Sequence, residues 1–149
     1  MSDCSEPERR QFDFWLGLWD VHDPDGNLAG RNRIIALFDG CALREEWHGA
    51  SGFRGTSLNS WSAQSGRWHQ TWVDSSGLLL RLDGELRDGS MVMEGEAPLP
   101  GQGARVLRHR ISWSPTAGNP DRLRQHWEVN VEDGAWETVF DGRYRRAAD

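Results

Sequence analysis

The sequence predicts an all-β protein, a single antiparallel up-and-down barrel of about ten strands. Segments of alternating polar and apolar residues recur roughly every 10–14 residues, and turn-forming pairs such as Asp-Gly and Ser-Gly separate nearly all of them. After Gly17, no segment of useful length has helical periodicity. Sequential hairpins favour a closed barrel over a sandwich, because closure hides the edges of so long a meander. The length suits one domain, residues 1–149.

The expected elements begin with a short N-terminal helix. Ser5 and Glu8 have the spacing of a capping box, and Phe12 and Trp15 begin an apolar stripe, behind a loose lead-in at residues 1–10. Alternation and turn chemistry then predict the strands. They are expected over residues 19–23, 30–38, 41–49, 54–62, 67–74, 78–86, 90–96, 104–114, 122–130 and 135–146.

Composition and charge exclude several classes of partner. Seventeen Lys and Arg against 23 Asp and Glu give a net charge of −6, which argues against nucleic acid because phosphate binding needs a basic surface. No run of ~18 apolar residues exists, so no membrane-spanning segment is predicted. The start, MSDCSEPERRQFDFW, lacks the basic and apolar regions of a signal peptide, so a cytoplasmic location is expected.

The cysteines and the known catalytic motifs point to no particular reaction. Cys4 and Cys41 are too few for a disulfide framework and lack the spacing of a metal site, and Cys4 is expected to be a surface thiol. No phosphate-binding loop, dinucleotide fingerprint or Gly-x-Ser-x-Gly motif is present. No set of three or four ligands is placed to converge on zinc, so neither a metal nor a cofactor is expected.

The nine tryptophans carry the strongest functional signal. In four strands a hydrogen-bonding side chain stands two residues before a tryptophan, so both lie on one face. These pairs are Glu45 and Trp47, Asn59 and Trp61, Gln70 and Trp72, and Gln125 and Trp127. Trp68 and Asp74 share the face of Gln70, and a fifth strand places His109 and Trp113 together. Because the opposite faces are mostly of solvent type, these faces are expected to point inward.

The inward polar groups have two interpretations. They could satisfy one another in a sealed network, or they could be polar points in a pocket with aromatic walls. A barrel of about ten strands is wider than its side chains alone can fill, which favours a pocket for a small hydrophobic or aromatic molecule. Its candidate ligand-binding residues are Glu45, Trp47, Asn59, Trp61, Trp68, Gln70, Trp72, Asp74, His109, Trp113, Gln125 and Trp127.

Three other functions stay open. The protein could be a cofactor-independent isomerase or cyclase in which Glu45, Asp74 or His109 moves a proton. His109, the one histidine that alternation places inside, could instead ligate haem and bind a gas. The interior could also be filled, in which case the protein would act through its surface, and a homodimer is open.

The start of the chain resembles the lipocalin-like (calycin) barrels. FDFWLGLWDV contains Gly17-Leu18-Trp19, which looks like their Gly-x-Trp at the entry to the first strand, after a short helix. In those barrels an arginine of the last strand lies over that tryptophan. The resemblance gives this cation–π role to Arg143 or Arg145.

A longer set of segments extends the resemblance. FDFWLGLWDV, LREEWHGASGFRGTSLN, GRWHQTWVDSSG and FDGRYRR are together similar to an uncharacterised bacterial family of small lipocalin-like proteins, described only as a domain of unknown function. That family implies the barrel and no ligand. More distantly similar are fatty-acid-binding-protein-like barrels and the haem-binding nitrobindins, which place their iron-ligating histidine near the end of the chain. The last strand here contains no histidine, and the last one in the chain is His126.

Overall fold

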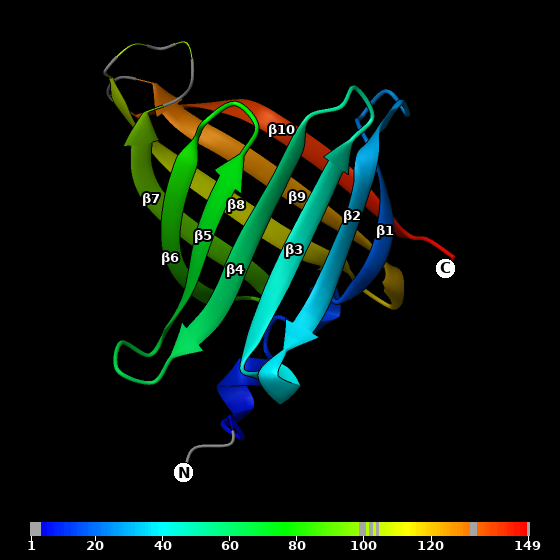
Figure 1. Ribbon diagram of the computed structural model, residues 1–149, viewed down its shortest axis with the longest axis vertical. Helices are drawn as coiled ribbons and strands as arrows, with labels where there is room; N and C mark the ends of the chain where they lie inside the picture. The colour runs from blue at the N-terminus through cyan, green and yellow to red at the C-terminus, as the bar shows by residue number, and fades with distance from the viewer. Residues whose placement is uncertain (1–3, 99–100, 102, 104, 132–133, 149) are drawn as a thin grey trace.

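Ten antiparallel strands close into a barrel in the computed structural model, which describes residues 4–98, 101, 103, 105–131 and 134–148 (Figure 1). The strands are β1 (Gly17–His22), β2 (Leu28–Leu37), β3 (Ala42–Gly49), β4 (Arg54–Ser62), β5 (Arg67–Asp74), β6 (Leu79–Arg87), β7 (Ser90–Pro98), β8 (Val106–Thr116), β9 (Asn119–Val131) and β10 (Ala135–Arg146). Each strand pairs with the next in sequence, and β10 pairs with β1. The predicted all-β up-and-down barrel is confirmed, and its topology is consistent with a lipocalin-like fold.

Strand alternation places the large apolar side chains inside the barrel. In β6, Leu80 and Leu82 are buried while Leu79 is exposed. In β5, Trp68 and Gln70 are buried on either side of a half-buried residue. Because successive side chains of a strand point to opposite faces, the period-two pattern of the sequence identifies the inner face correctly.

The closing strands place an arginine over the first tryptophan of the barrel. Trp19 in β1 is opposite Arg146 in β10, and the guanidinium carbon of Arg146 lies 4.2 Å from the centre of the Trp19 ring. The prediction of Arg143 or Arg145 for this role is wrong. Tyr144 points into the barrel, and alternation gives Arg146 the same face. Arg143 and Arg145 are exposed on the outer face.

Two short 3₁₀ turns precede the barrel, η1 (Pro7–Arg10) and η2 (Asp13–Trp15). The predicted short N-terminal helix is thus present in a tighter form. The turn η1 starts after Glu6, whose side chain makes no capping hydrogen bond, so Ser5 does not have the capping role that its spacing suggested. Proline suits the first position of η1, because the missing N–H would have no partner there in any case.

Phe12 and Trp15 form a plug inside one end of the barrel. Both side chains are fully buried, and their stacked rings are 4.6 Å apart between centres. Phe12 also presents its ring at steep angles to Trp68 and Trp113, at 5.6 and 5.2 Å. Burying each such side chain contributes about 1.5–3 kcal/mol, so the plug stabilises the fold as well as closing this end.

A disulfide between Cys4 and Cys41 ties the plug to the β2–β3 connection, where η3 (Phe38–Gly40) lies. Arg9 adds a hydrogen bond to the backbone carbonyl of Trp61, at 2.9 Å. The expectation of a surface thiol at Cys4 is wrong, because the fold brings together two cysteines that are 37 residues apart, and their spacing in the sequence carries no sign of this. Both contacts are made by the segment expected to be a loose lead-in, residues 1–10, within its described part.

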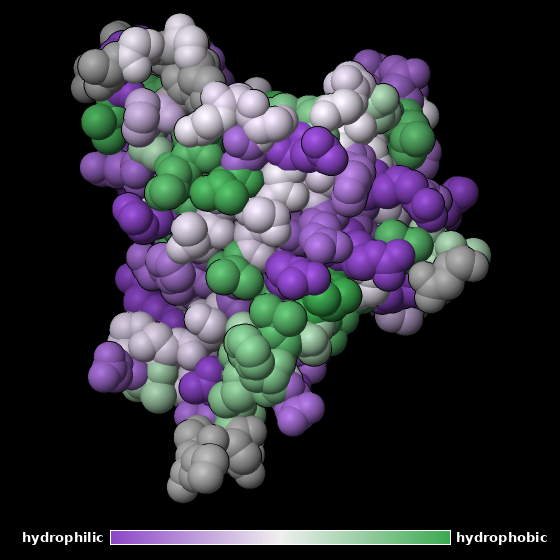
Figure 2. Space-filling model, in the orientation of Figure 1, coloured by the Kyte–Doolittle hydropathy of each residue, from purple (hydrophilic) through white to green (hydrophobic). Residues whose placement is uncertain are grey.

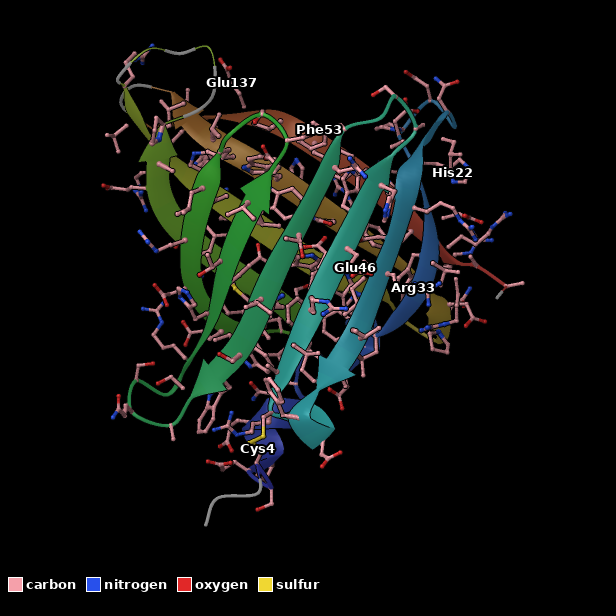
Figure 3. All side chains as sticks on the ribbon, viewed as in Figure 1. Cys4, His22, Arg33, Glu46, Phe53 and Glu137 are labelled. Carbon is pink, nitrogen blue, oxygen red and sulfur yellow. A yellow bond between two sulfur atoms is a disulfide. The ribbon has the colours of Figure 1, made fainter. Side chains whose placement is uncertain are left out.

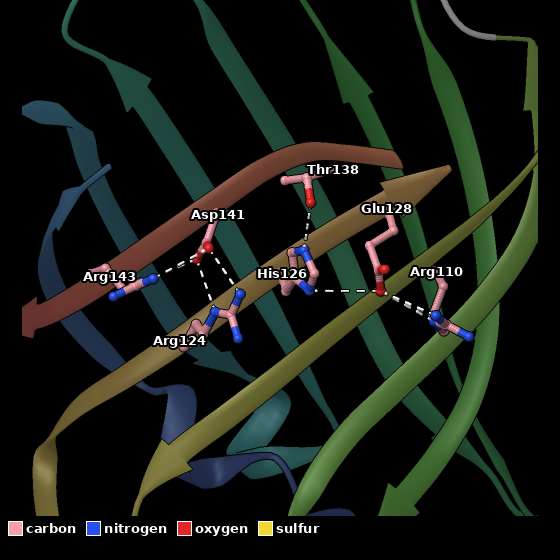
Figure 4. A network of polar contacts seen from close by, with 7 residues as sticks. All are labelled: Arg110, Arg124, His126, Glu128, Thr138, Asp141 and Arg143. Atoms are coloured by element: carbon pink, nitrogen blue, oxygen red, sulfur yellow. Dashed lines mark hydrogen bonds and ion pairs between the residues drawn. The ribbon is translucent and has the colours of Figure 1, made fainter. Parts of the chain in front are cut away.

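The side of the barrel seen in Figure 2 mixes hydrophilic and hydrophobic residues on its outer surface. Over β8, β9 and β10 its charged side chains form a network (Figure 4). Arg124 donates to both oxygens of Asp141, at 2.9 and 2.8 Å, and Arg143 also pairs with Asp141. These hydrogen bonds, chiefly those from Arg124, hold the pKa of the Asp141 carboxyl well below its usual range. Within the described residues, no helix is long and apolar enough to cross a membrane.

Candidate functional site

A cavity of about 270 Å³ lies inside the barrel at the end away from the plug. Figure 3 shows Phe53 at this end of the molecule and Cys4 at the other. Phe53 and Val139 line the mouth and are partly exposed. The volume is close to the lower end of the range for small-molecule pockets. The aromatic walls are formed by Trp47, Trp72, Trp127 and Phe140, and the buried lining includes Glu45, Gln70, Leu80, Ile111, Gln125 and Tyr144.

Glycines on neighbouring strands make room for the aromatic walls. A Cβ atom placed on Gly30 would stand 2.8 Å from the indole of Trp47, and one placed on Gly55 would collide with the indole of Trp72. Trp47 also contacts Phe140 edge to face, with ring centres 5.8 Å apart. Because glycine leaves these positions empty, the rings lie close against the strands, and the space between them stays open.

Seven hydrogen-bonded side chains, called the polar row below, cross the inner face of the barrel from β5 to β9. They are Gln70, Asn59, Ser57, Glu45, Asn32, Tyr144 and Gln125. All seven are at most 9% exposed. A buried network of this kind is stable only when most of its groups have partners, so the contacts decide what it can do.

One arm of the polar row runs from Gln70 to Glu45. Gln70 Nε2 donates to Asn59 Oδ1 at 2.7 Å. Asn59 Nδ2 donates to Ser57 Oγ at 2.9 Å, and Ser57 Oγ donates to Glu45 Oε1 at 2.8 Å. Every hydrogen bond of this arm is therefore donated toward the carboxyl group.

The other arm runs from Glu45 to Gln125. Asn32 Nδ2 donates to Glu45 Oε2 and to the Tyr144 hydroxyl, both at 2.8 Å. The Tyr144 hydroxyl in turn donates to Gln125 Oε1 at 2.5 Å. The carboxyl group thus receives one hydrogen bond on each oxygen, and Glu45 is the junction of the two arms.

Burial dominates the electrostatics of Glu45. Desolvation raises the pKa of its carboxyl group from 4.5 to about 7, although the hydrogen bonds from Asn32 and Ser57 lower it. Burial, followed by the nearby charge of Glu45, raises the pKa of Tyr144 well above 10, so the tyrosine stays neutral. A carboxyl group that titrates near neutrality beside a cavity can accept or release a proton, which is what general acid–base catalysis requires.

His109 is fully buried, and both of its ring nitrogens are used. Nδ1 accepts a hydrogen bond from Trp127 Nε1 at 3.0 Å, so Nε2 carries the proton and donates it to the carbonyl of Ala97 at 2.9 Å. Burial lowers the pKa of the imidazole. Neither nitrogen has a lone pair open to iron, so His109 as arranged here does not fit a haem ligand. Its contacts orient Trp127 in the cavity wall.

Six of the twelve residues predicted to bind a ligand line the cavity. They are Glu45, Trp47, Gln70, Trp72, Gln125 and Trp127. Asn59 points inward as expected but lies behind Gln70 in the polar row. His109 likewise lies behind Trp127. These two residues therefore support lining residues and do not reach the space themselves.

The remaining four predicted residues lie elsewhere. Trp68 and Trp113 pack around the plug at the closed end, and the guanidinium of Arg9 lies 5.4 Å from the ring centre of Trp61. Asp74 is at the end of β5, where its Oδ2 accepts a hydrogen bond from Trp72 Nε1 at 2.7 Å. Its carboxylate holds the indole of a wall residue in place.

Sequence reasoning missed several residues of the site. Asn32 and Tyr144 belong to the polar row, and Phe140 belongs to the wall. Asn32 had a usable signal, since it alternates with the inward Ile34 in β2. The inner face of β10 was harder to identify, because a register shift between Thr138 and Phe140 interrupts the alternation.

No family model matches the chain, and no curated protein matches its sequence. Resemblance to the bacterial lipocalin-like family therefore stays a prediction. Across the described ranges, no group of three or more His, Cys, Asp or Glu side chains is placed to hold a metal ion. The cavity is therefore the feature of the molecule that indicates a function.

Proposed function

We propose that this protein binds a small, flat, largely apolar molecule in the cavity. The observation that carries the proposal is the combination of aromatic walls with a buried polar row that ends at the same space. Small-molecule sites have this composition, since apolar walls supply burial and a few polar groups set orientation. The wall residues Trp47 and Trp72 lie against glycines and leave the interior open, which supports a site more than a filled core.

A substitution that fills the cavity tests this proposal. Leu80 lines the cavity and is the cross-strand neighbour of Trp72 on the adjacent strand β6. Leu80→Trp is therefore expected to weaken the binding of bicyclic aromatic compounds at least about tenfold, measured by isothermal titration calorimetry. The matched control is Leu79→Trp, since Leu79 is the adjacent residue on the outer face. Equal affinity in both variants, or no binding to the wild-type protein, would contradict the proposal.

A second candidate function is catalysis of proton transfer by Glu45, the prediction of a cofactor-independent isomerase or cyclase. It is favoured by one observation, the buried carboxyl group with a pKa of about 7 beside the cavity. In this reaction the carboxylate takes a proton from the carbon next to a ketone and returns one to the substrate. Bound 1-tetralone in D₂O is expected to gain deuterium at that carbon, followed by NMR.

The adjacent glutamates of β3 supply the control for this second function. Glu45 is buried and points inward. Glu46, labelled in Figure 3, points outward and pairs with Arg44. Exchange that is lost in Glu45→Gln and kept in Glu46→Gln supports catalysis. Exchange at the uncatalysed rate in the wild-type protein would leave ligand binding as the function.

The cytoplasmic location expected from the sequence is a separate proposal, which the disulfide between Cys4 and Cys41 does not support and makes testable. Disulfides persist in oxidising compartments and are rare in the cytosol. Thiol trapping in intact cells would therefore show Cys4 and Cys41 mostly reduced if the protein is cytoplasmic. A fully oxidised pair would place the protein in an oxidising compartment instead.

A further inference from the structure

We infer that the ligand is a planar heterocycle that donates a hydrogen bond at one edge, to Gln70, and accepts one at the opposite edge, from Gln125. The inference rests on the proposed function and specifies the class of molecule that the cavity takes. It follows from the direction in which the hydrogen bonds of the polar row run, beginning at the carboxylate of Glu45.

The carboxylate determines the orientation of the first arm. An ionised carboxyl group only accepts, so Ser57 must donate to Glu45 and must accept from its other neighbour. The amide of Asn59 therefore turns Nδ2 toward Ser57 and Oδ1 toward Gln70. Gln70 then has to present Nε2 to Asn59, which leaves its Oε1 as the free end of this arm.

The carboxylate of Glu45 also orients the second arm, whose free end is a donor and not an acceptor. Asn32 must turn Nδ2 toward the carboxylate of Glu45, and its second N–H goes to the Tyr144 hydroxyl. That hydroxyl has accepted a hydrogen bond from Asn32, so it gives its own proton to Gln125 Oε1. The free end of this arm is therefore Gln125 Nε2, which is a donor.

The two free ends face the cavity without partners from the chain. Gln70 is 2% exposed and Gln125 is 9% exposed, and both line the cavity. Among the described residues, neither Gln70 Oε1 nor Gln125 Nε2 has a hydrogen-bond partner. Neither atom is among the fully buried ones, so both are open to the space of the cavity. A ligand that enters this space displaces water from them, and one that pairs with both gains affinity and a defined orientation over one that leaves either unpaired.

The positions of the two glutamines decide the geometry of the ligand. Gln70 is in β5 and Gln125 is in β9, with β6, β7 and β8 between them on the shorter way round the barrel. A ligand between them has to present its donor and its acceptor at opposite edges. Trp72 and Trp127 each follow one of these glutamines by two residues on the same face, so each polar contact lies beside an indole that favours a planar ring.

A series of four bicyclic probes tests the inference in the wild-type protein. Naphthalene has neither group, indole has only the donor, quinoline has only the acceptor, and 4-quinolone has N–H and C=O at opposite edges. Affinities are measured by competition calorimetry at about pH 8.5, above the pKa of about 7 of Glu45, so that the carboxylate orients the row. Each hydrogen bond is expected to improve affinity about fivefold, so 4-quinolone binds about 25-fold more tightly than naphthalene.

Two variants assign the two hydrogen bonds. Gln70→Leu is expected to abolish the preference for indole over naphthalene and to keep the preference for quinoline, and Gln125→Leu is expected to do the reverse. Gln11→Leu is the matched control, because Gln11 accepts from Trp68 near the plug and lies outside the cavity. It is expected to leave all four affinities unchanged, and circular dichroism checks that each variant is folded.

The outcomes separate this inference from the proposed function. If naphthalene binds as tightly as 4-quinolone, the inference is overturned while the cavity remains a binding site. If indole and quinoline have equal affinities within each of the two glutamine variants, the assignment of the acceptor to Gln70 and of the donor to Gln125 is wrong. If none of the four probes binds the wild-type protein, the proposed function falls together with the inference.

Discussion

Glu45 is the residue on which the interior of this barrel depends. The residue is 4% exposed, and its carboxyl group receives one hydrogen bond on each oxygen, from Asn32 and Ser57. Two neutral hydrogen bonds do not replace the hydration of a full charge, which is why burial raises its pKa. The same charge sets the direction of the hydrogen bonds in the polar row. Glu45 therefore affects both the pH dependence of stability and the polar atoms that face the cavity.

Stability is expected to fall as the pH rises because of Glu45. The pKa in the folded protein, about 7, lies above the ordinary value of 4.5, so the folded state holds this proton more tightly than the unfolded state. The stabilisation is complete below about pH 4.5 and is lost as the pH rises through 7. This shift corresponds to about 3 kcal/mol in the free energy of unfolding.

Denaturant unfolding of the wild-type protein and of Glu45→Gln at several pH values measures this effect. The difference between their free energies of unfolding is expected to change by about 3 kcal/mol between pH 4.5 and 8. Taking the difference cancels the other buried groups, among them His109, whose lowered pKa acts in the opposite direction. Glu46→Gln, on the outer face of the same strand, is the control. A difference that does not vary with pH would show that Glu45 is not destabilised by burial.

At the scale of elements, we expect the N-terminal plug to contribute to stability and the open end to determine ligand affinity. The disulfide ties the plug to the β2–β3 connection, and the cavity lies at the end of the barrel away from it. Removing the disulfide frees the unfolded chain from a loop that spans 37 residues. In the chain-entropy model such a loop contributes about 4 kcal/mol.

The double variant Cys4→Ser, Cys41→Ser is therefore expected to lose about 4 kcal/mol in the free energy of unfolding and to bind cavity ligands with unchanged affinity. Unfolding in denaturant and calorimetry measure the two quantities, and the wild-type protein under reducing conditions is the control. A large loss of affinity in this variant would show that the plug and the cavity are coupled.

Most elements could be predicted because each depends on local pattern. Alternation and Asp-Gly or Ser-Gly turns show in short segments, so strands such as β5 and β6 lie close to their expected ranges. The contact with Trp19 was assigned to Arg143 or Arg145 because the inner face of β10 had not been identified. The register between β10 and β1 determines that Arg146 makes this contact. The disulfide between Cys4 and Cys41 was missed because it needs the whole barrel in place.

At the scale of the whole molecule, the barrel has a packed half around the plug and an open half around the cavity. Alternation predicted which tryptophans point inward, and it could not predict how far along the barrel axis each one lies. Trp68 and Trp113 fall at the plug, whereas Trp47, Trp72 and Trp127 fall at the cavity. That division depends on the position of each residue along its strand and on the segment that folds into one end. Neither is visible in the period-two pattern.

The most direct test of the cavity as a binding site uses the tryptophans themselves. Indole N–H signals in a ¹H–¹⁵N NMR spectrum, assigned by single Trp→Phe variants, report on each ring during a titration with 4-quinolone. We expect shifts at Trp47, Trp72 and Trp127, which line the cavity. The signals of Trp15, buried in the plug, and of Trp136, which lies on the outer face against Arg110, are expected to stay unchanged. Shifts at Trp136 alone, or no shifts at saturating concentrations, would contradict this expectation.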